Sequence, residues 1–176
     1  MSIDGIPVVP EPTQDRLEDR KLVDYRDHRE RFIEWCLSLG KNPKAAEGYS
    51  PYTVKNRAYR TDTFYRWVWD ETGSYTTQVT HEHADDYTRE LAYGDSSASH
   101  KADTQKALKM LFRWRADALG EEEWEPKLVF NDNSSKATQQ DYLTHDERKQ
   151  IREAALDYGS IPSYNTVGPD DRIALR

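Results

Sequence analysis

The 176-residue sequence has little of what marks a secreted or membrane-spanning protein. Its only cysteine is Cys36, so the chain cannot form an internal disulfide and a reducing compartment is favoured. No apolar run approaches the roughly 18 residues that a membrane-spanning helix needs. Residues 1–12 contain neither a basic segment nor a useful apolar stretch, so no signal peptide is predicted. We therefore expect a cytoplasmic protein with no membrane partner.

Hydrophobic residues are also scarce, at 36% of the chain, and the mean hydropathy is -1.00. The 5 Trp, 11 Tyr and 4 Phe nevertheless exclude full disorder, because disordered chains lack aromatic residues.

A net charge of -7 argues, taken alone, against a nucleic-acid partner. However, Asp outnumbers Glu by 18 to 14, and Arg outnumbers Lys by 15 to 10, as in proteins of salt-loving organisms. In a protein of a salt-loving organism, a negative net charge says little about its partners. The alternative interpretation of the composition is an ordinary acidic protein.

The sequence lacks the common motifs of enzyme and cofactor sites. It has no phosphate-binding P-loop, no dinucleotide fingerprint, no GxSxG and no CxxC. The triplet His81-Glu82-His83 is a weak metal candidate, because helical positions two apart point about 200° away from each other. Cys36 lies on the apolar face of a predicted helix, which indicates core packing. We expect no catalytic residue, metal or cofactor in this chain.

Apolar periodicity and capping residues predict an all-α fold of four to five helices, with no strand and no internal repeat. The Ser50-Pro51 pair is a strong helix start, because Ser caps well and Pro is favoured at the first helical position. Gly40, Gly94 and Gly120 are predicted to end helices. The first four helices are expected over about residues 16–39, 50–72, 81–93 and 97–119.

The chain divides into four parts by composition. Residues 1–15 hold three prolines and no helical period, which predicts a flexible tail. Residues 16–120 form the helical domain, and residues 121–141, rich in Glu, Asn and Ser, are interpreted as a linker. Thr144 and Glu147 form a capping box with Leu143 at the staple position, which opens a fifth helix in residues 142–176. That last part is too short for a core of its own and is interpreted as the start of a truncated second domain.

Positive charge is concentrated in two of the predicted helices. Residues 50–69 carry a net charge of +3 and residues 96–116 carry +4, which leaves -14 for the rest of the chain. Lys106, Lys109 and Arg113 fall within an arc of about 60°, opposite the apolar stripe of their helix. Segregated basic faces of this kind are typical of nucleic-acid binding, whereas a single basic face is usually only solvated surface.

The candidate DNA-binding residues combine cations for phosphates with hydrogen-bonding side chains for bases or phosphates. His100 joins them because a helix N-terminus favours phosphate. Arg29, on the first helix, is expected to matter much less. The candidate residues are Thr53, Lys55, Asn56, Arg60, Arg66, His100, Lys101, Thr104, Gln105, Lys106, Lys109 and Arg113.

Three phrases in the sequence resemble tyrosine recombinases, the family of phage integrases and the Xer-like group. Ser50-x-x-Thr53-Val54 followed by Phe64-Tyr65-x-Trp67 is similar to the second helix of that family's core-binding domain. Residues 99–114 resemble the fourth helix, and Tyr142-Leu143-Thr144-x-x-Glu147 resembles the opening of the catalytic domain. The order and spacing match over about residues 20–158, and the composition suggests a halophilic archaeal version.

The resemblance implies a SAM-like orthogonal bundle whose second and fourth helices lie against a double-stranded DNA half-site. It also implies other recombinase protomers as partners, in a tetramer for the full-length family. The family's catalytic set of Arg, Lys, H-x-x-R and Tyr nucleophile cannot be placed here. His28 with Arg31 and His145 with Arg148 have the H-x-x-R spacing, but both lie upstream of where that motif belongs. We therefore expect a DNA-binding core domain for DNA integration or recombination that is not itself an enzyme.

Two other functions remain open from the sequence. A stand-alone helical DNA-binding regulator would share the basic helices without a missing domain. A helical bundle for protein interaction would turn the same basic faces toward an acidic partner. Protection of a specific inverted repeat would favour the recombinase or the regulator over the protein-interaction bundle.

Overall fold

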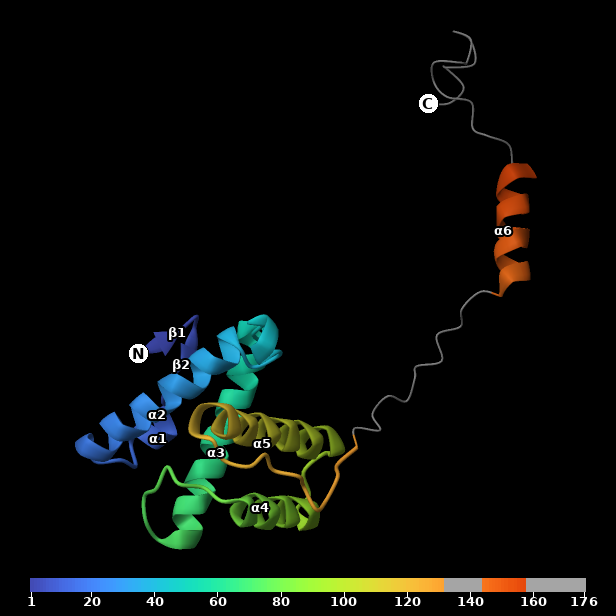
Figure 1. The fold of residues 1–176 in the computed structure, drawn as a ribbon. Helices are drawn as coiled ribbons and strands as arrows, with labels where there is room; N and C mark the ends of the chain where they lie inside the picture. The colour runs from blue at the N-terminus through green and yellow to red at the C-terminus, as the bar shows by residue number, and fades with distance from the viewer. Residues whose placement is uncertain (132–143, 158–176) are drawn as a thin grey trace. The chain divides into compact units, whose positions relative to one another are not determined.

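A computed structural model of the chain describes residues 1–131 and 144–157, within two separate units, residues 1–135 and 136–176 (Figure 1). The described part is predominantly α-helical, which confirms the predicted fold class. The helices of the first unit are α1 (Glu11–Gln14), α2 (Asp19–Ser38), α3 (Pro51–Thr72), α4 (His81–Tyr93) and α5 (Ala98–Leu119), with a 3₁₀ turn at Pro43–Ala45. The second unit contains α6 (His145–Asp157).

The ends of the long helices follow the predicted capping chemistry. The Ser50 hydroxyl accepts a hydrogen bond from the Thr53 backbone N–H at the start of α3. Gly120 ends α5 in the left-handed conformation, with φ +72°, which glycine adopts without strain. At α4 the Thr80 and His83 side chains each pair with the other residue's backbone N–H, so His83 serves as a cap. No cluster of metal-ligating side chains occurs among the described residues.

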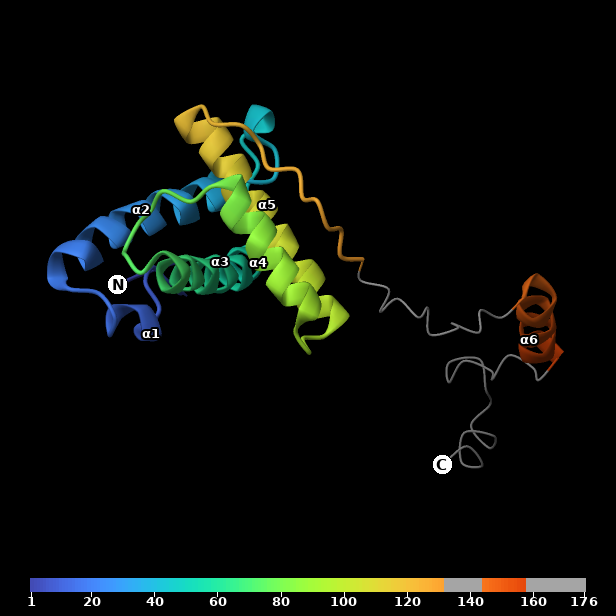
Figure 2. The ribbon, with the colours of Figure 1, turned by 90° about the horizontal axis from the view of Figure 1, so that it is seen from below.

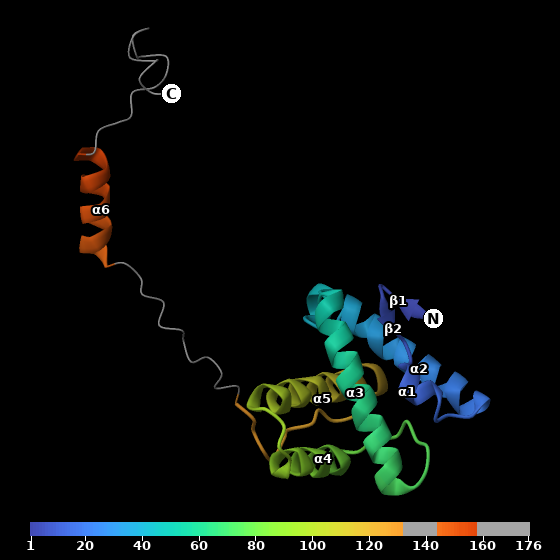
Figure 3. The same ribbon diagram turned by 180° about the vertical axis from the view of Figure 1, so that it is seen from behind.

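Helix α5 is the centre of the first unit and packs against α2, α3 and α4. Helix α3 crosses both α5 and α4 steeply, whereas α4 and α5 lie side by side (Figures 1 and 3). The predicted apolar stripe of α5, with Ala107, Leu111 and Trp114, is buried in this arrangement. No helix in the described ranges has the length and apolarity needed to cross a bilayer.

The N-terminal segment was expected to be a flexible tail without strands, and this expectation is wrong. Residues Ser2–Ile3 (β1) and Ile6–Pro7 (β2) form a small antiparallel hairpin (Figures 1 and 3), and α1 follows it (Figure 2). The side chains of Ile6, Val8 and Val9 are buried in the hydrophobic core. Burial of these three aliphatic side chains stabilises the segment in place, so the proline content marks a rigid turn region instead of disorder.

Arg29 of α2 holds this segment against α3 from inside the core. Its side chain is 0% exposed. Nε donates to the Val8 carbonyl (3.2 Å), Nη1 to the Thr61 hydroxyl (2.7 Å) and Nη2 to the Ala58 carbonyl (2.7 Å). Arg29 is therefore not a surface cation: its charge is buried and its hydrogen bonds join three segments, so its replacement would disturb the fold as well as the charge.

A second buried polar residue, Asp62 on α3, also joins the helices. Its carboxylate accepts hydrogen bonds from the hydroxyls of Thr13 (2.8 Å) and Tyr25 (3.0 Å), and from Arg66 Nε (3.2 Å). These contacts fasten α1 and α2 to the middle of α3. Together, Arg29 and Asp62 make the first residues of the chain part of the domain.

The segment after α5 also belongs to the domain, at least as far as Asn131. It runs back between α4 and α5 (Figures 1 and 3). The indole of Trp124 is buried, and its Nε1 donates to Asp85 (3.1 Å). The domain therefore extends over residues 1–131 instead of 16–120, and the predicted linker of residues 121–141 is wrong for its first eleven residues. Residues 132–141 lie outside the described residues.

The second unit begins as the capping box predicts. The Thr144 backbone N–H donates to the Glu147 carboxylate (2.7 Å), and the Glu147 N–H donates to the Thr144 hydroxyl (3.2 Å). The predicted staple at Leu143 and the chain from residue 158 onward lie outside the described residues, so the assignment of residues 142–176 to a second domain stays a prediction.

His28 makes the fold sensitive to acid. The ring is buried, and its Nε2 lies 2.7 Å from the Tyr65 hydroxyl. Burial, together with the cations of Arg29 and Arg115, lowers the pKa of His28 from 6.5 to about 3. Below pH 6.5 the unfolded chain therefore binds a proton at this residue that the folded chain does not. The free energy of unfolding consequently decreases as the pH is lowered from 6.5 to about 3.

We expect His28→Phe to reduce this acid sensitivity. Between pH 7 and pH 4.5 the His28 contribution amounts to a loss of about 2.5 kcal/mol of unfolding free energy. The variant loses the Tyr65 contact at both pH values, so the diagnostic quantity is its change in urea-unfolding free energy between them. A change equal to that of the wild type would contradict the assignment.

We expect Asp62→Ala to destabilise the protein by about 3 kcal/mol, because it leaves the hydroxyls of Thr13 and Tyr25 and the Arg66 guanidinium without their buried acceptor. Asp70→Ala is the matched control. Asp70 also lies on α3, but it is exposed and its only ion-pair partner among the described residues is Arg16 at the surface, so little change is expected. Equal urea-unfolding midpoints for the two variants would show that the Asp62 network is not an anchor.

Candidate nucleic-acid interface

The part of α5 that reaches solvent is a narrow basic stripe. Between Ala102 and Arg115 only Lys106 and Lys109 are exposed, while Asp103 and Arg113 are half-buried and the other residues are buried. The predicted basic arc is therefore on the surface, opposite the buried Met110, Leu111 and Trp114. Because three sides of α5 are covered by neighbouring helices, this stripe is what the central helix presents to a ligand.

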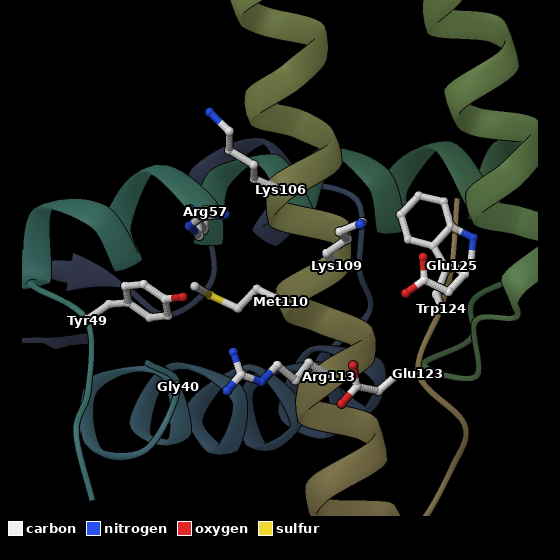
Figure 4. Close-up of a pocket in the computed structure, with 10 residues that line it drawn as sticks. All are labelled: Gly40, Tyr49, Arg57, Lys106, Lys109, Met110, Arg113, Glu123, Trp124 and Glu125. Atoms are coloured by element: carbon white, nitrogen blue, oxygen red, sulfur yellow. The ribbon is translucent and has the colours of Figure 1, made fainter. Parts of the chain in front are cut away.

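A pocket of about 290 Å³ lies along this stripe (Figure 4). Lys106, Lys109 and Arg113 project from successive turns of α5, and Arg57 of α3 lines the same pocket. Four cations thus surround one opening. The remaining wall contains Gly40, Tyr49, Met110, Glu123, Trp124 and Glu125.

Arg57 has the least satisfied guanidinium of this group. The group lies over the Tyr49 ring, 5.6 Å from its centroid, which is within cation–π range. Its Nε is buried and has no hydrogen-bond partner among the residues that the structure describes. That buried N–H is out of reach of a ligand, so the attraction of Arg57 for an anionic oxygen comes from its positive charge at the walls of the pocket.

A second pocket, of about 300 Å³, adjoins the first through Arg57. It lies between the first turns of α3 and the start of α5, and its walls include Thr53, Asn56 and Arg60. The remaining lining residues are Tyr52, Arg57 and Asp103. The structure thus joins the predicted basic faces of α3 and α5 into one surface, here called the α3–α5 face. It comprises Thr53, Asn56, Arg57, Arg60, Lys106, Lys109 and Arg113.

Arg60 connects the two helices across this face. Its Nη1 donates to His100 Nδ1 (3.1 Å) and to the Thr104 hydroxyl (3.0 Å), and its Nη2 lies 3.8 Å from the Asp103 carboxylate. Burial and the Arg60 charge lower the pKa of His100 below its ordinary value. His100 is therefore neutral at pH 7 and adds a hydrogen-bonding edge to the start of α5, but no positive charge.

Two of the predicted contact residues are buried and unavailable. Thr104 is 1% exposed, and its hydroxyl is used by Arg60. Gln105 is 5% exposed, and its amide is bound at both ends, donating to the Leu128 carbonyl and accepting from the Phe130 N–H. The expectation of direct DNA contact is corrected for both residues, because both face the helices and the segment that pack around α5.

Three other predicted residues are exposed or half-buried, with differing availability. Lys101 donates to the carbonyls of Ala92 (3.1 Å) and Gly94 (2.8 Å), so it closes the end of α4. Arg66 shares its charge with buried Asp62. Lys55 is exposed on α3 and forms no ion pair within the described residues.

Sequence reasoning missed Arg57, Tyr49 and Lys44 as parts of this site. Lys44 lines a further pocket of about 430 Å³ together with Arg113, Asp117 and Glu123, so the cations there lie beside carboxylates. Arg57 could have been found, because it lies three residues before Arg60 and therefore on a neighbouring position of the same helix flank. Tyr49 and Lys44 lie in the loop before α3, where no periodicity predicts position.

Comparison of the chain with protein-family models, with curated proteins and with solved structures gives no match. The assignment of a ligand therefore depends on the geometry of the α3–α5 face. That geometry offers grouped cations together with exposed amide and hydroxyl groups, which suit a ligand rich in phosphate.

Proposed function

We propose that this chain binds double-stranded DNA through the α3–α5 face, as the DNA-clamping core-binding domain of a tyrosine recombinase. The observation that carries the proposal is the surface of α5. In a chain with a net charge of -7, the only exposed residues of the central helix between Ala102 and Arg115 are Lys106 and Lys109, with Arg113 and Asp103 half-buried beside them. Sequestering cations in one place within an acidic protein creates a local attraction for phosphate that net charge conceals.

The spacing of these cations suits a DNA backbone. Lys106 and Arg113 are seven residues apart, which is about 10 Å along a helix. A DNA strand carries one phosphate per 3.4 Å of its axis, so the stripe covers about three phosphates. Arg57 and Arg60 continue the cationic surface on α3, in the two adjoining pockets.

The recombinase part of the proposal is supported by agreement between two independent arguments. The resemblance of the sequence implies that the second and fourth long helices face DNA, and these correspond to α3 and α5. Charge and exposure single out the same two helices without reference to any family. The chain as given holds no recognisable set of catalytic residues, so we propose binding and orientation of a half-site, beside other protomers, without strand cleavage.

We expect Lys106→Glu with Lys109→Glu to abolish binding to duplex DNA while the helical circular-dichroism spectrum stays unchanged. Both side chains are exposed, so the fold tolerates reversal, whereas two new carboxylates repel phosphate at the centre of the face. Fluorescence anisotropy of a labelled duplex measures the affinity. Unchanged affinity in the double variant would refute this face as the binding site.

The matched control is Lys21→Glu. Lys21 is exposed on α2 and lines a pocket with Trp69 and Gly73 at the far end of α3, about 20 Å or more from Arg57 along that helix. Its reversal makes the same change in net charge as one of the two reversals, and it should leave DNA affinity nearly unaltered. An acidic polypeptide such as polyglutamate serves as a competitor, and preferential binding of that polymer would support the protein-interaction alternative.

The salt dependence of the affinity for DNA should reflect the number of cations that can contact phosphates. Residues 50–69 and 96–116 hold nine cations, but Arg115 is buried against Glu121, Lys101 is bound to carbonyls and Arg66 is paired with Asp62. The remaining six are Lys55, Arg57, Arg60, Lys106, Lys109 and Arg113, and phosphate displaces Asp103 from Lys106 (3.2 Å) and Arg60 (3.8 Å). Six phosphate contacts predict a slope of log affinity against log salt of about -5.4, not the roughly -8 of nine contacts. DNA titrations in potassium chloride test this, and a slope of about -7 or steeper would contradict the contact set.

A further inference from the structure

Helix α3 displays an uncharged stripe of hydrogen-bonding side chains beside the basic surface. Tyr52, Asn56, Tyr59 and Thr63 fall within an arc of about 60° when each residue turns the helix by 100°. All four are exposed, Tyr52 by 79% and Tyr59 by 42%. The stripe, here called the α3 stripe, extends over about 16 Å of the helix.

Cations flank the α3 stripe on both sides. Lys55 and Arg66 lie along one side, and Arg57 and Arg60 lie along the other, as their positions on the helix require. The carboxylate of Asp62 is turned into the core and bound by Thr13 and Tyr25. Between residues 52 and 66 α3 itself therefore exposes no acidic group, and the acidic residue of the adjoining pocket, Asp103 of α5, lies 3.8 Å from Arg60.

This arrangement has the chemistry of a helix that enters the major groove of DNA. The groove is about 12 Å wide and admits one α-helix, with phosphates along both walls and base edges at its floor. Lateral cations then meet the two walls, and the uncharged stripe meets the floor. Solvated surface alone gives no reason for two large tyrosines and an amide to align between two rows of cations.

Asn56 is the member of the stripe best suited to read a base. It is exposed, lines the second pocket and forms no side-chain hydrogen bond with any described residue. Its amide offers one donor edge and one acceptor edge, which match N7 and the N6 amino group of adenine. Thr63, in contrast, already donates to the Tyr59 carbonyl and accepts from Arg66.

We infer that α3 lies in the major groove and that Asn56 selects an adenine there, with Tyr52 and Tyr59 against the neighbouring base pairs. This inference rests on the proposed DNA binding and adds the origin of sequence preference. The α3–α5 cations supply affinity for any duplex, because they contact phosphates, and Asn56 supplies discrimination. Affinity and preference are therefore separable by substitution.

The test is a selection of preferred sites from a randomised duplex library by the full chain, repeated with Asn56→Ala and with Lys106→Ala. The wild type should enrich a motif that contains an adenine, and replacing that base should weaken binding by about 5- to 150-fold. Asn56→Ala should lose the preference at this one position while the other positions of the selected motif keep theirs. Alanine favours helix, so α3 should remain folded.

Lys106→Ala is the complementary variant. It should weaken binding to every sequence alike and leave the selected motif intact, because a phosphate contact carries no sequence information. An Asn56→Ala motif that is identical to the wild-type motif, or a wild-type selection without any motif, would overturn the inference. A preference for single-stranded over duplex DNA would also overturn it, because it would indicate stacking of bases on Tyr52 and Tyr59 instead.

Failure of the proposed function looks different from failure of this inference. If the chain binds no duplex, or binds it equally well after reversal of Lys106 and Lys109, the α3–α5 face is not a DNA site. If duplex binding depends on those lysines but the preferred sequence does not depend on Asn56, the face is a DNA site and the α3 stripe does not read it.

Discussion

The buried guanidinium of Arg29 is the interaction on which the arrangement of this domain depends. A cation without solvent is costly unless each of its N–H groups finds an acceptor, and here the acceptors are two backbone carbonyls and a hydroxyl from two other segments. The hydrogen bonds to Ala58 and Thr61 fix how α3 is rotated relative to α2. That rotation points Val54, Ala58 and Tyr65 inward, and consequently turns the opposite surface of α3 to solvent.

The central place of α5 determines the second half of the functional surface. A helix covered by neighbours on most sides has few positions left for polar residues, so the character of the open strip is set by a handful of side chains. Here those are two lysines and an arginine, with Asp103 beside them. On the buried side of α5, Arg115 binds Glu121 and the Thr77 carbonyl (3.0 Å). This one side chain therefore joins two loops to the helix.

Helix positions could be read from the sequence because caps and glycines are local signals. Ser50, Thr80 and Ser97 act as caps, and the basic arc on α5 is exposed as its angular position requires. The N-terminal hairpin and the segment around Trp124 could not be predicted, because each is ordered by contacts distant in sequence: Val8 with Arg29, and Trp124 with Asp85.

For the candidate site, polarity was a poor guide to exposure. Gln105 is polar but buried, because the carbonyl of Leu128 and the N–H of Phe130 need its amide. Arg57 gained its importance from its place over the Tyr49 ring and between two pockets, which the sequence alone does not reveal. Residue spacing could place a side chain on a helix face, but it could not say which neighbour covers that face.

Because the hydrogen bonds of Arg29 are buried, their contribution to stability does not depend on ionic strength. Dissolved salt weakens the attraction between exposed charges, and at about 1 M the screening length is only about 3 Å. Surface pairs such as Arg16 with Asp70 then contribute nothing, whereas ions cannot enter between a buried guanidinium and the carbonyls it touches. The contacts that hold the domain together are therefore buried and not screened by salt. The exposed cations are the groups whose interactions depend on salt concentration.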